Sequence, residues 1–592
     1  MGLEPATARA PKPPPQPEES LGLEAFRSID RMREALTAQA TGGLSPAALA
    51  LAFMDWSIHL AVAPGKRMEL VWKGSEKAGR FGAHLLSAST GTHAPPCIEP
   101  LPGDSRFTAK AWEQPPFCFW AQAFLLGQQW WHNATREVPG VAPHHEDVVS
   151  FTARQLLDMF SPGNFLPTNP VVLRQTLASG GMNLARGAVH AVEDFERLVG
   201  GAPPAGAEDF VVGRDVAVTP GKVVLRNRLI ELIQYAPATA DVYAEPVLIV
   251  PAWIMKYYIL DLSPHNSLVR YLVERGHTVF CISWKNPGTD ERELDMDDYL
   301  QLGFFAALDA INAIVPGQKV HATGYCLGGT LLAIAAAAMD RDGDARLGSM
   351  TLFTAQTDFT EPGELALFID DSEVSLLEAQ MEETGFLTAG QMAGAFQILR
   401  SNDLLWSRVV GEYLMGERTP MNDLMAWNAD ATRMPARMHS QYLRRLFLND
   451  DLSEGRYPVG GKPVALSDIE LPVFCVATLT DHVAPWRSVY KLHYLVPTEI
   501  SFVLTSGGHN AGIVSEPGRP RRSFRMHTRP AGGNYVPPDD WLERTPEQEG
   551  SWWPAWSDWL ATRSGARVAP PAIGAPDYPA LDDAPGCYVH EK

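Results

Sequence analysis

The stretch "KVHATGYCLGGTLLAIAAAAM", residues 319–339, joins an apolar run typical of a buried strand to an alanine-rich run typical of a helix. Between them stands Cys326, with Gly324 before it and Gly328 and Gly329 after it. Glycines are expected where a strand and the following helix approach too closely for a Cβ atom. A thiol on such a turn stands clear of the sheet, and the helix N-terminus favours the reactive thiolate. The pattern predicts a nucleophilic cysteine, and its alternative is a buried, inert cysteine in a glycine-rich turn.

Short apolar runs of similar character lie on both sides of this turn in the sequence. They are nearly continuous in β-branched and aromatic residues, which is typical of strands buried on both faces of a parallel sheet. Helical runs at 265–276 and 297–314 alternate with the first of these strands, which indicates βαβ units and a doubly wound sheet. The expected strands lie in "EPVLIVPAW" (245–253), "HTVFCISW" (277–284), "LPVFCVATLTD" (471–481) and "ISFVLTSGGH" (500–509).

Asp481 and His509 each follow the end of one of these expected strands. Sites form at the carboxyl ends of strands in such sheets, and the order cysteine, aspartate, histidine is that of the triad in α/β-hydrolase folds. Taken singly, Asp481 could cap the next helix and His509 could be an ordinary loop residue. Together with Cys326 they predict a triad in which His509 is the base and Asp481 orients it. His482 competes as the base, but its place next to Asp481 in sequence suits it poorly to bridge Asp481 and Cys326.

An oxyanion that forms at a substrate carbonyl needs backbone N–H donors. The N–H of Leu327, directly after the nucleophile, is the first expected donor. The second should come from the loop after "EPVLIV". Pro251 has no N–H, so Ala252, Trp253 and Ile254 remain, and of these we assign Ile254.

The chain divides into an expected disordered tail, a helical part and a catalytic part. Residues 1–20 are rich in proline and charge, and residues 21–205 show helical apolar patterns that end near "GGAPPAGAEDF". Residues 206–592 hold the expected sheet, interrupted at about 356–440 by a helix-rich, charged insert that predicts a cap or lid. The predicted fold is an α/β-hydrolase-like, doubly wound, mostly parallel sheet with a helical cap insert, plus a mainly helical N-terminal domain.

The composition is that of a globular protein with an acidic balance. Lys and Arg number 49 and Asp and Glu number 69, so the net charge is 49 − 69 = −20. This argues against nucleic-acid binding, which needs a basic face. The six cysteines show no metal-ligand or CxxC spacing, which predicts free thiols in a reducing, cytoplasmic compartment. We find no secretory signal pattern and no apolar run long enough for a bilayer, so no transmembrane segment is expected.

Several longer motifs resemble those of the polyhydroxyalkanoate synthases. They are "GYCLGGT", "DHVAPW" and "GGHNAGIVSEPG" around the three expected catalytic residues, with "GHTVFCISWKNP", "SPGNFLPTNP" and "GSWWPAWSDWL" elsewhere. The resemblance runs from about residue 45 to the end of the sequence and is to the single-subunit class I enzymes. It implies transfer of (R)-3-hydroxyacyl groups, typically 3-hydroxybutyryl, from coenzyme A to a growing polyester. It also implies no cofactor, a homodimer, and association with cytoplasmic polyester granules.

The reaction that this resemblance implies accounts for a cysteine at the turn. A thiolate that attacks an acyl-CoA thioester forms another thioester of nearly equal energy, so the acyl group stays activated for the next step. Two motifs depart from the family. "GYCLGGT" replaces the commoner GFCVGGT, and "PAWI" (251–254) replaces a version with Pro-Cys, which leaves the acyl-chain preference open.

Weaker signals point to substrate contacts. We assign Trp253 and Tyr257 to the substrate pocket and Arg400 to an anionic group of coenzyme A. The alternatives are that Tyr257 fills the core and that Arg400 is only solvated. The four tryptophans within residues 552–559 lie at near-helical spacing, which favours a helix packed on the core over contact with polymer.

Two rival functions remain at this level. A hydrolase, such as a polyester depolymerase or thioesterase, can use the same cysteine triad, although the long helical N-terminal part argues against it. A non-catalytic granule-binding protein would not need the triad at all.

Overall fold

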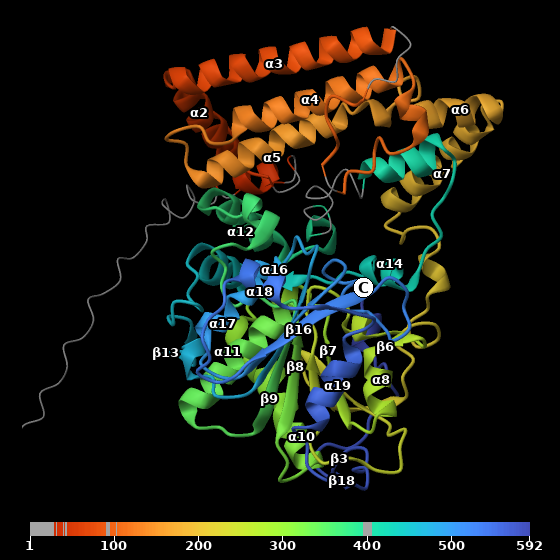
Figure 1. Cartoon of the computed structure of the whole chain (residues 1–592). Coiled ribbons are helices and arrows are strands. Elements are labelled where there is room, and N and C mark those ends of the chain that lie inside the picture. Colours follow the sequence, from red (N-terminus) through yellow and green to blue (C-terminus); the bar gives the residue numbers. More distant parts are fainter. Residues whose placement is uncertain are drawn as a thin grey trace, which may run out of the picture.

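The fold is built around a ten-stranded sheet with the strand order β1-β2-β7-β4-β8-β9-β14-β15-β16-β17 (Figure 1). The computed structural model describes residues 29–592, apart from residues 31, 39–40, 42–43, 90–94, 102, 393 and 395–404. The expected tail at residues 1–20 therefore lies outside the described residues. The strands are β1 (Gly221–Arg226), β2 (Ile230–Tyr235), β4 (Val247–Val250), β7 (Val279–Trp284), β8 (Val320–Tyr325), β9 (Leu347–Phe353), β14 (Val473–Thr478), β15 (Ile500–Thr505), β16 (Ser523–Arg529) and β17 (Glu547–Glu549).

The inner strands of the sheet, from β7 across to β15, run parallel to one another. Antiparallel pairings of β1, β2, β16 and β17 extend the sheet on its two sides. Inner strands such as β4 and β14 are buried at every position, which explains their nearly continuous apolar sequences. The predicted mostly parallel α/β sheet is confirmed.

The strand order reverses at β4. This strand lies between β7 and β8 in the sheet, although it precedes both of them in the chain. Chain connections therefore lead away from β4 in opposite directions, and the carboxyl ends of strands at such a point are where α/β sheets bind ligands. The carboxyl end of β4 leads into residues 251–254, and that of β8 leads into Cys326.

Helices cover the sheet, and the tryptophan-rich helix is one of them. All four tryptophans of residues 552–559 are buried. Trp556 donates from its indole N–H to the hydroxyl of Thr351 in β9 at 3.0 Å, so α19 packs on the core as the sequence favours. The helices of this part are α8 (Leu268–Glu274), α10 (Ala306–Ile314), α11 (Leu327–Asp342), α16 (Trp486–Tyr490), α17 (Leu492–Leu495), α18 (Pro538–Arg544) and α19 (Trp553–Ala561).

A layer of helices precedes the sheet in the chain and lies at the top of Figure 1. Ser45 caps α2 by accepting a hydrogen bond from the N–H of Ala48 at 3.2 Å. Among the described residues no single helix is long and apolar enough to cross a membrane; α2 and α3 pass that test only as a pair, bent by 89°. The helices are α2 (Pro46–Val62), α3 (Pro64–Ser89), α4 (Phe117–Thr135), α5 (Pro143–Met159), α6 (Pro170–Ala178) and α7 (Met182–Val199). The domain limit at residues 205 and 206 stays a prediction.

Residues 354–472 connect β9 to β14, and we call them the β9–β14 segment. Its helix α12 lies between the sheet and the N-terminal helices in Figure 1. Two of its short strands, β10 and β11, pair antiparallel. The elements of this segment are η7 (Gly363–Phe368), α12 (Asp371–Thr384), β10 (Phe386–Leu387), η9 (Val409–Leu414), α14 (Asp423–Asn428), β11 (Met434–Pro435), α15 (Ala436–Tyr442), η10 (Leu443–Leu448), β12 (Pro458–Val459), β13 (Lys462–Pro463) and η11 (Leu466–Asp468).

The N-terminal helix α7 packs closely against the β9–β14 segment. Gly187 is needed there, because a Cβ atom on it would lie 1.8 Å from the carbonyl oxygen of Tyr413. Close by, the carboxylate of Asp194 accepts hydrogen bonds from Arg408 at 2.6 Å and from Arg418 at 2.8 Å. Helix α7 is therefore bound to η9 and to the residues on both sides of it.

A second contact joins α2 to α12. The backbone N–H of Ser45 donates to both carboxylate oxygens of Glu373, at 2.9 and 2.8 Å. Glu373 is buried, and nearby His144 at the start of α5 lies 3.7 Å from the carboxylate of Asp370. The N-terminal helices and the β9–β14 segment thus share a polar interface.

Candidate active site

Cys326 lies on the sharp turn between β8 and α11. Its φ is +52°, in the left-handed region that residues with a side chain rarely adopt. The thiol is partly buried. Strain of this kind is characteristic of a nucleophile on a strand-to-helix turn, because the turn holds the side chain above the sheet edge.

The glycines around Cys326 are required by close backbone approaches. A Cβ atom on Gly328 would lie 2.1 Å from the carbonyl oxygen of Val250 in β4. A Cβ atom on Gly324 would lie 2.4 Å from the Cα atom of Gly329. No rotamer change relieves a collision with backbone, so the glycine spacing in the sequence reflects the packing of β8, β4 and α11.

Asp481 and His509 meet next to this turn. His509 Nδ1 lies 2.8 Å from Asp481 Oδ2. The other carboxylate oxygen, Oδ1, accepts from the backbone N–H groups of Val483 and Ala484, each at 2.9 Å. The hydroxyl of Thr478 also donates to Oδ2, at 3.1 Å, so these three donors fix the carboxylate, and the carboxylate in turn fixes the imidazole.

Electrostatics favour a charged imidazole at this place. Burial alone would lower the pKa of His509, but the Asp481 carboxylate and the neighbouring Cys326 sulfur raise it well above its ordinary value. Burial alone would raise the pKa of Asp481, but His509 and the two backbone N–H groups hold it below its ordinary value. The structure thus brings together Cys326, His509 and Asp481, with the aspartate on His509.

Cys326 opens into a small apolar cavity. Its volume is about 160 Å³, below the roughly 300–1,000 Å³ of pockets that enclose a drug-sized molecule. Most of its wall comes from the β9–β14 segment, and one residue, Leu44, comes from just before α2. We call it the cysteine cavity. It is lined by Leu44, Ile254, Cys326, Leu327, Leu365, Phe368, Ile369, Leu377, Leu387, Gln391, Met392, Met434, His439, Tyr442, Leu443, Phe447 and Val483.

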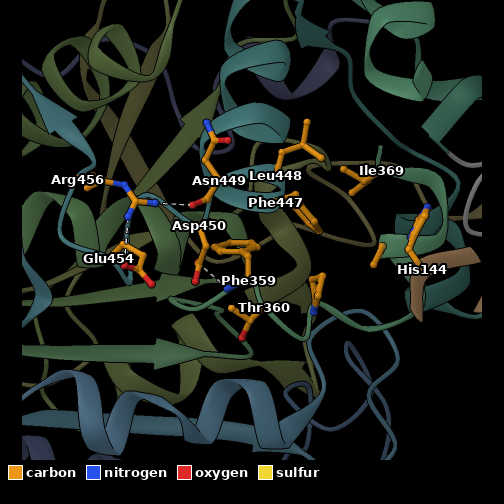
Figure 2. Close-up of a pocket in the computed structure, with 12 residues that line it drawn as sticks. His144, Phe359, Thr360, Ile369, Phe447, Leu448, Asn449, Asp450, Glu454 and Arg456 are labelled. Carbon is orange, nitrogen blue, oxygen red and sulfur yellow. Dashed lines mark hydrogen bonds and ion pairs between the residues drawn. The ribbon is translucent and has the colours of Figure 1, made fainter. Parts of the chain in front are cut away.

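A larger and more polar cavity of about 510 Å³ lies beside the first (Figure 2). The two share Ile369 and Phe447 in their walls. Figure 2 shows His144 of α5 facing this space from one side, and Asp450 and Arg456 on the other. The guanidinium of Arg456 is bound to Glu454 at 3.1 Å, so this cation is already paired.

The two expected oxyanion donors both lie at the cysteine cavity. Leu327 begins α11 and Ile254 follows β4, and each lines the cavity. The carbonyl oxygen of Ile254 accepts from the N–H of Thr432, at 3.2 Å. This bond anchors the loop after β4 to the β9–β14 segment.

The positions of Trp253 and Tyr257 do not support their assignment as substrate contacts. Trp253 is buried among aromatic rings, 4.9 Å from the ring centre of Tyr299. Tyr257 is buried as well, and neither residue belongs to the wall of the cysteine cavity. Arg400 lies outside the described residues.

Sequence reasoning missed most of the cavity residues, among them Leu44, His439 and Tyr442. Leu44 is far from Cys326 in the chain, and nothing in its local sequence indicates contact with a site. His439 and Tyr442 occupy α15 on the cavity wall, within the "ARMHSQY" run that carries no motif. Burial raises the pKa of Tyr442 well above its ordinary value, with a smaller contribution from Cys326, and both residues line the same cavity.

Comparisons with known proteins decide the family. The model "Poly-beta-hydroxybutyrate polymerase N terminal" matches residues 24–66, "Poly-beta-hydroxybutyrate polymerase (PhaC) N-terminus" matches 103–272, and "alpha/beta hydrolase fold" matches 245–516. Poly(3-hydroxyalkanoate) polymerase of Methylorubrum extorquens is 41% identical over 534 residues, which cover 89% of this chain and 87% of that protein. The chain belongs to the poly(3-hydroxyalkanoate) polymerase family.

Two more members of the poly(3-hydroxyalkanoate) polymerase family are similar over most of the chain. The polymerase subunit PhaC of Rhizobium etli is 38% identical over 504 residues, covering 83% of this chain and 78% of that protein. The subunit of Cupriavidus necator is 38% identical over 499 residues, covering 83% of both chains. The resemblance drawn from the motifs around Cys326 and the predicted α/β-hydrolase fold are therefore confirmed.

Proposed function

We propose that this polymerase-family chain transfers (R)-3-hydroxyacyl groups from coenzyme A to a growing polyester through an acyl-Cys326 intermediate. The supporting observation is the arrangement of Cys326, His509 and Asp481 at the sheet edge, next to an apolar cavity. Family membership supports the substrate class. The small cavity supports a short acyl group, with 3-hydroxybutyryl as the first choice.

The first half of the proposed reaction loads the enzyme. His509 takes the proton of the Cys326 thiol, and the thiolate attacks the thioester carbonyl of the acyl-CoA. The C–S bond to coenzyme A breaks, and the departing thiolate takes the proton from His509. Backbone N–H groups of Leu327 and Ile254 are assigned to hold the oxyanion during this step.

The second half lengthens the polymer. The hydroxyl oxygen of a chain end attacks the carbonyl carbon of acyl-Cys326, and His509 accepts the hydroxyl proton. A C–O ester bond forms as the C–S bond to Cys326 breaks, which regenerates the cysteine once His509 returns the proton. Asp481 stabilises the imidazolium in both halves.

The acyl-enzyme must be kept from water, or the product is a free acid. The β9–β14 segment, which contains the predicted insert at 356–440, supplies most of the apolar wall around Cys326. We therefore assign it the role of a cap that excludes water. Exclusion of water from the acyl-enzyme is the property that distinguishes a polymerase from a hydrolase with the same triad.

We also assign the polyester granule surface as a partner and the granule as the location, with the homodimer as the working assembly. Exposed apolar side chains on α2, α3 and α7, among them Ile58, Trp72 and Phe195, support contact with an uncharged polyester. Co-sedimentation with the polyester that the protein makes tests the partner. Light scattering of the purified protein tests the dimer.

The decisive experiment incubates the purified protein with 3-hydroxybutyryl-CoA. Free coenzyme A and insoluble polyester are measured in the same sample, with Cys326→Ala as the control for background hydrolysis. We expect both products to rise together in the wild type and neither in the variant. Release of coenzyme A with only soluble 3-hydroxybutyrate would identify a thioesterase instead.

A further inference from the structure

His439 is a polar group on a mostly apolar cavity wall, which also holds Gln391 and Tyr442. It lies in α15 and lines the cysteine cavity together with Cys326. Its side chain is buried, with 6% of the residue exposed, and its Nδ1 atom has no hydrogen-bond partner among the described residues. Met434 and Leu443, which precede and follow it in the chain and line the same cavity, are apolar. A buried polar atom without a partner needs an explanation, and a ligand is one.

Other buried histidines in the described part of the chain also have an unpartnered ring nitrogen. His277 and His493 are examples. Neither belongs to the wall of the cysteine cavity or of the larger cavity beside it. His439 differs because a substrate that acylates Cys326 must enter the space that its ring borders.

The ring of His439 is uncharged at neutral pH. Burial lowers the pKa of His439 to about 4, and the negative charge of Glu378 opposes this only in part. The Glu378 carboxylate is itself bound to Arg444 at 2.7 Å and to Ser440. A neutral imidazole has one N–H donor and one bare acceptor nitrogen, so it can pair with a hydroxyl, which has the same two capacities.

This role is distinct from that of the proposed base. Asp481 is bound to His509 and not to His439, so His439 lacks the carboxylate that makes an imidazole a strong base. The partner with which His439 can pair is an uncharged polar group of the substrate. The only such group that the acyl part of a 3-hydroxyacyl-CoA has beyond its thioester carbonyl is the 3-hydroxyl.

We propose that His439 binds the 3-hydroxyl of the acyl group that enters the cysteine cavity, and that it thereby makes the enzyme select 3-hydroxyacyl over unsubstituted acyl thioesters. The proposal rests on the proposed function, because it takes the substrate class from it. His439 is a specificity-determining residue here, and the acyl transfer itself remains with Cys326 and His509. A site built to hydrogen-bond a hydroxyl discriminates strongly against an analogue that lacks it, since the buried group is then left unpaired.

The test compares two substrates that differ only in this hydroxyl. Enzyme in excess is mixed with 3-hydroxybutyryl-CoA or with butyryl-CoA, and the rate of the first release of coenzyme A is measured. Butyryl-CoA can load Cys326 but carries no hydroxyl to continue the chain. The quantity of interest is the ratio of the two loading rates, which an unspecific loss of activity leaves unchanged.

We expect the wild type to load the hydroxylated substrate at least about tenfold faster, which corresponds to about 1.4 kcal/mol. His439→Phe should remove most of this ratio by slowing the hydroxylated substrate alone. His439→Gln, which keeps a donor and an acceptor, should restore part of it. His493→Phe, a buried histidine away from the cavity, is the matched control and should keep the wild-type ratio.

Three results would overturn the proposal. One is a wild-type ratio near 1, and another is that His439→Phe slows the loading of neither substrate. The third is an equal slowing of both substrates, which would mark His439 as a packing residue only. If His439→Phe does not fold, as judged by circular dichroism, His439→Leu replaces it with the same expectation. A wild type that releases no coenzyme A from either substrate would overturn the proposed function, whereas the first three results leave that function standing.

Discussion

Glu373 makes the contact between α2 and α12 sensitive to pH. Burial raises the pKa of this carboxyl to about 7 from its ordinary value of 4.5, with a smaller contribution from the charge of Asp370. The backbone N–H of Ser45 and the nearby His144 oppose the rise. The folded protein therefore binds a proton at Glu373 that the unfolded chain has released, over the range from about pH 4.5 to about pH 7.

The sign of the effect on stability follows from this proton. Where the folded state binds more protons than the unfolded state, the free energy of unfolding falls as pH rises. A shift of about 2.5 units, from 4.5 to about 7, corresponds to about 3 kcal/mol at about 1.4 kcal/mol per unit. Glu373 thus lowers stability by up to about 3 kcal/mol above pH 7, and by almost nothing below pH 4.5.

The perturbation is Glu373→Gln, which keeps an acceptor oxygen for the N–H of Ser45 but carries no charge. We expect the variant and the wild type to melt at similar temperatures at pH 5. At pH 8 the variant should melt higher, because it has no buried charge to accommodate. Thermal unfolding followed by circular dichroism at half-unit steps from pH 5 to pH 8 measures the difference.

The control is Glu383→Gln, an exposed glutamate on the same helix. Its melting curve should follow the wild type at every pH. Parallel pH profiles for Glu373→Gln and the wild type would refute the reasoning, since they would mean that the Glu373 carboxyl titrates equally in the folded and unfolded states.

Three further predictions concern the candidate site. Cys326→Ala should fold with a near-normal melting temperature but release no coenzyme A, and Cys326→Ser should be far slower than the wild type; normal release by Cys326→Ala would reject the nucleophile. Asp481→Asn should lower turnover by roughly 10⁴-fold and lower the pKa of His509, read by NMR, because the carboxylate that raises it is gone; an unchanged His509 pKa would contradict this. Gly328→Ala should give insoluble protein, since its Cβ would lie 2.1 Å from the oxygen of Val250; a soluble, active variant would contradict the packing described.

The sequence predicts those residues of the site that directly follow a strand. Cys326, Asp481 and His509 each follow a strand, and the carboxyl ends of parallel strands meet at one sheet edge, so their meeting could be inferred from strand positions alone. The same reasoning cannot place residues that reach the site through packing of distant segments. His439 and Leu44 are examples, because a single residue on a helix or just before one gives no local sign of what it faces.

Two aromatic residues that we assigned to the substrate pocket do not line the cysteine cavity. Trp253 and Tyr257 follow β4 directly, so their sequence position indicated the substrate pocket. Their rings turn instead into the core, where Trp253 packs against Trp284 and Tyr299. Large apolar side chains gain more by burial between elements than at a cavity surface, and sequence position does not separate these two outcomes.

Leu44 contributes to the wall of the cysteine cavity from a segment outside the sheet. The residue stands just before Ser45, whose backbone is fixed to Glu373 in the β9–β14 segment. Chimeras between members of the family that exchange only the sheet-bearing part would combine one member's cysteine with another's wall. To change which monomer the enzyme accepts, residues 44–45 and α12 therefore have to be exchanged together.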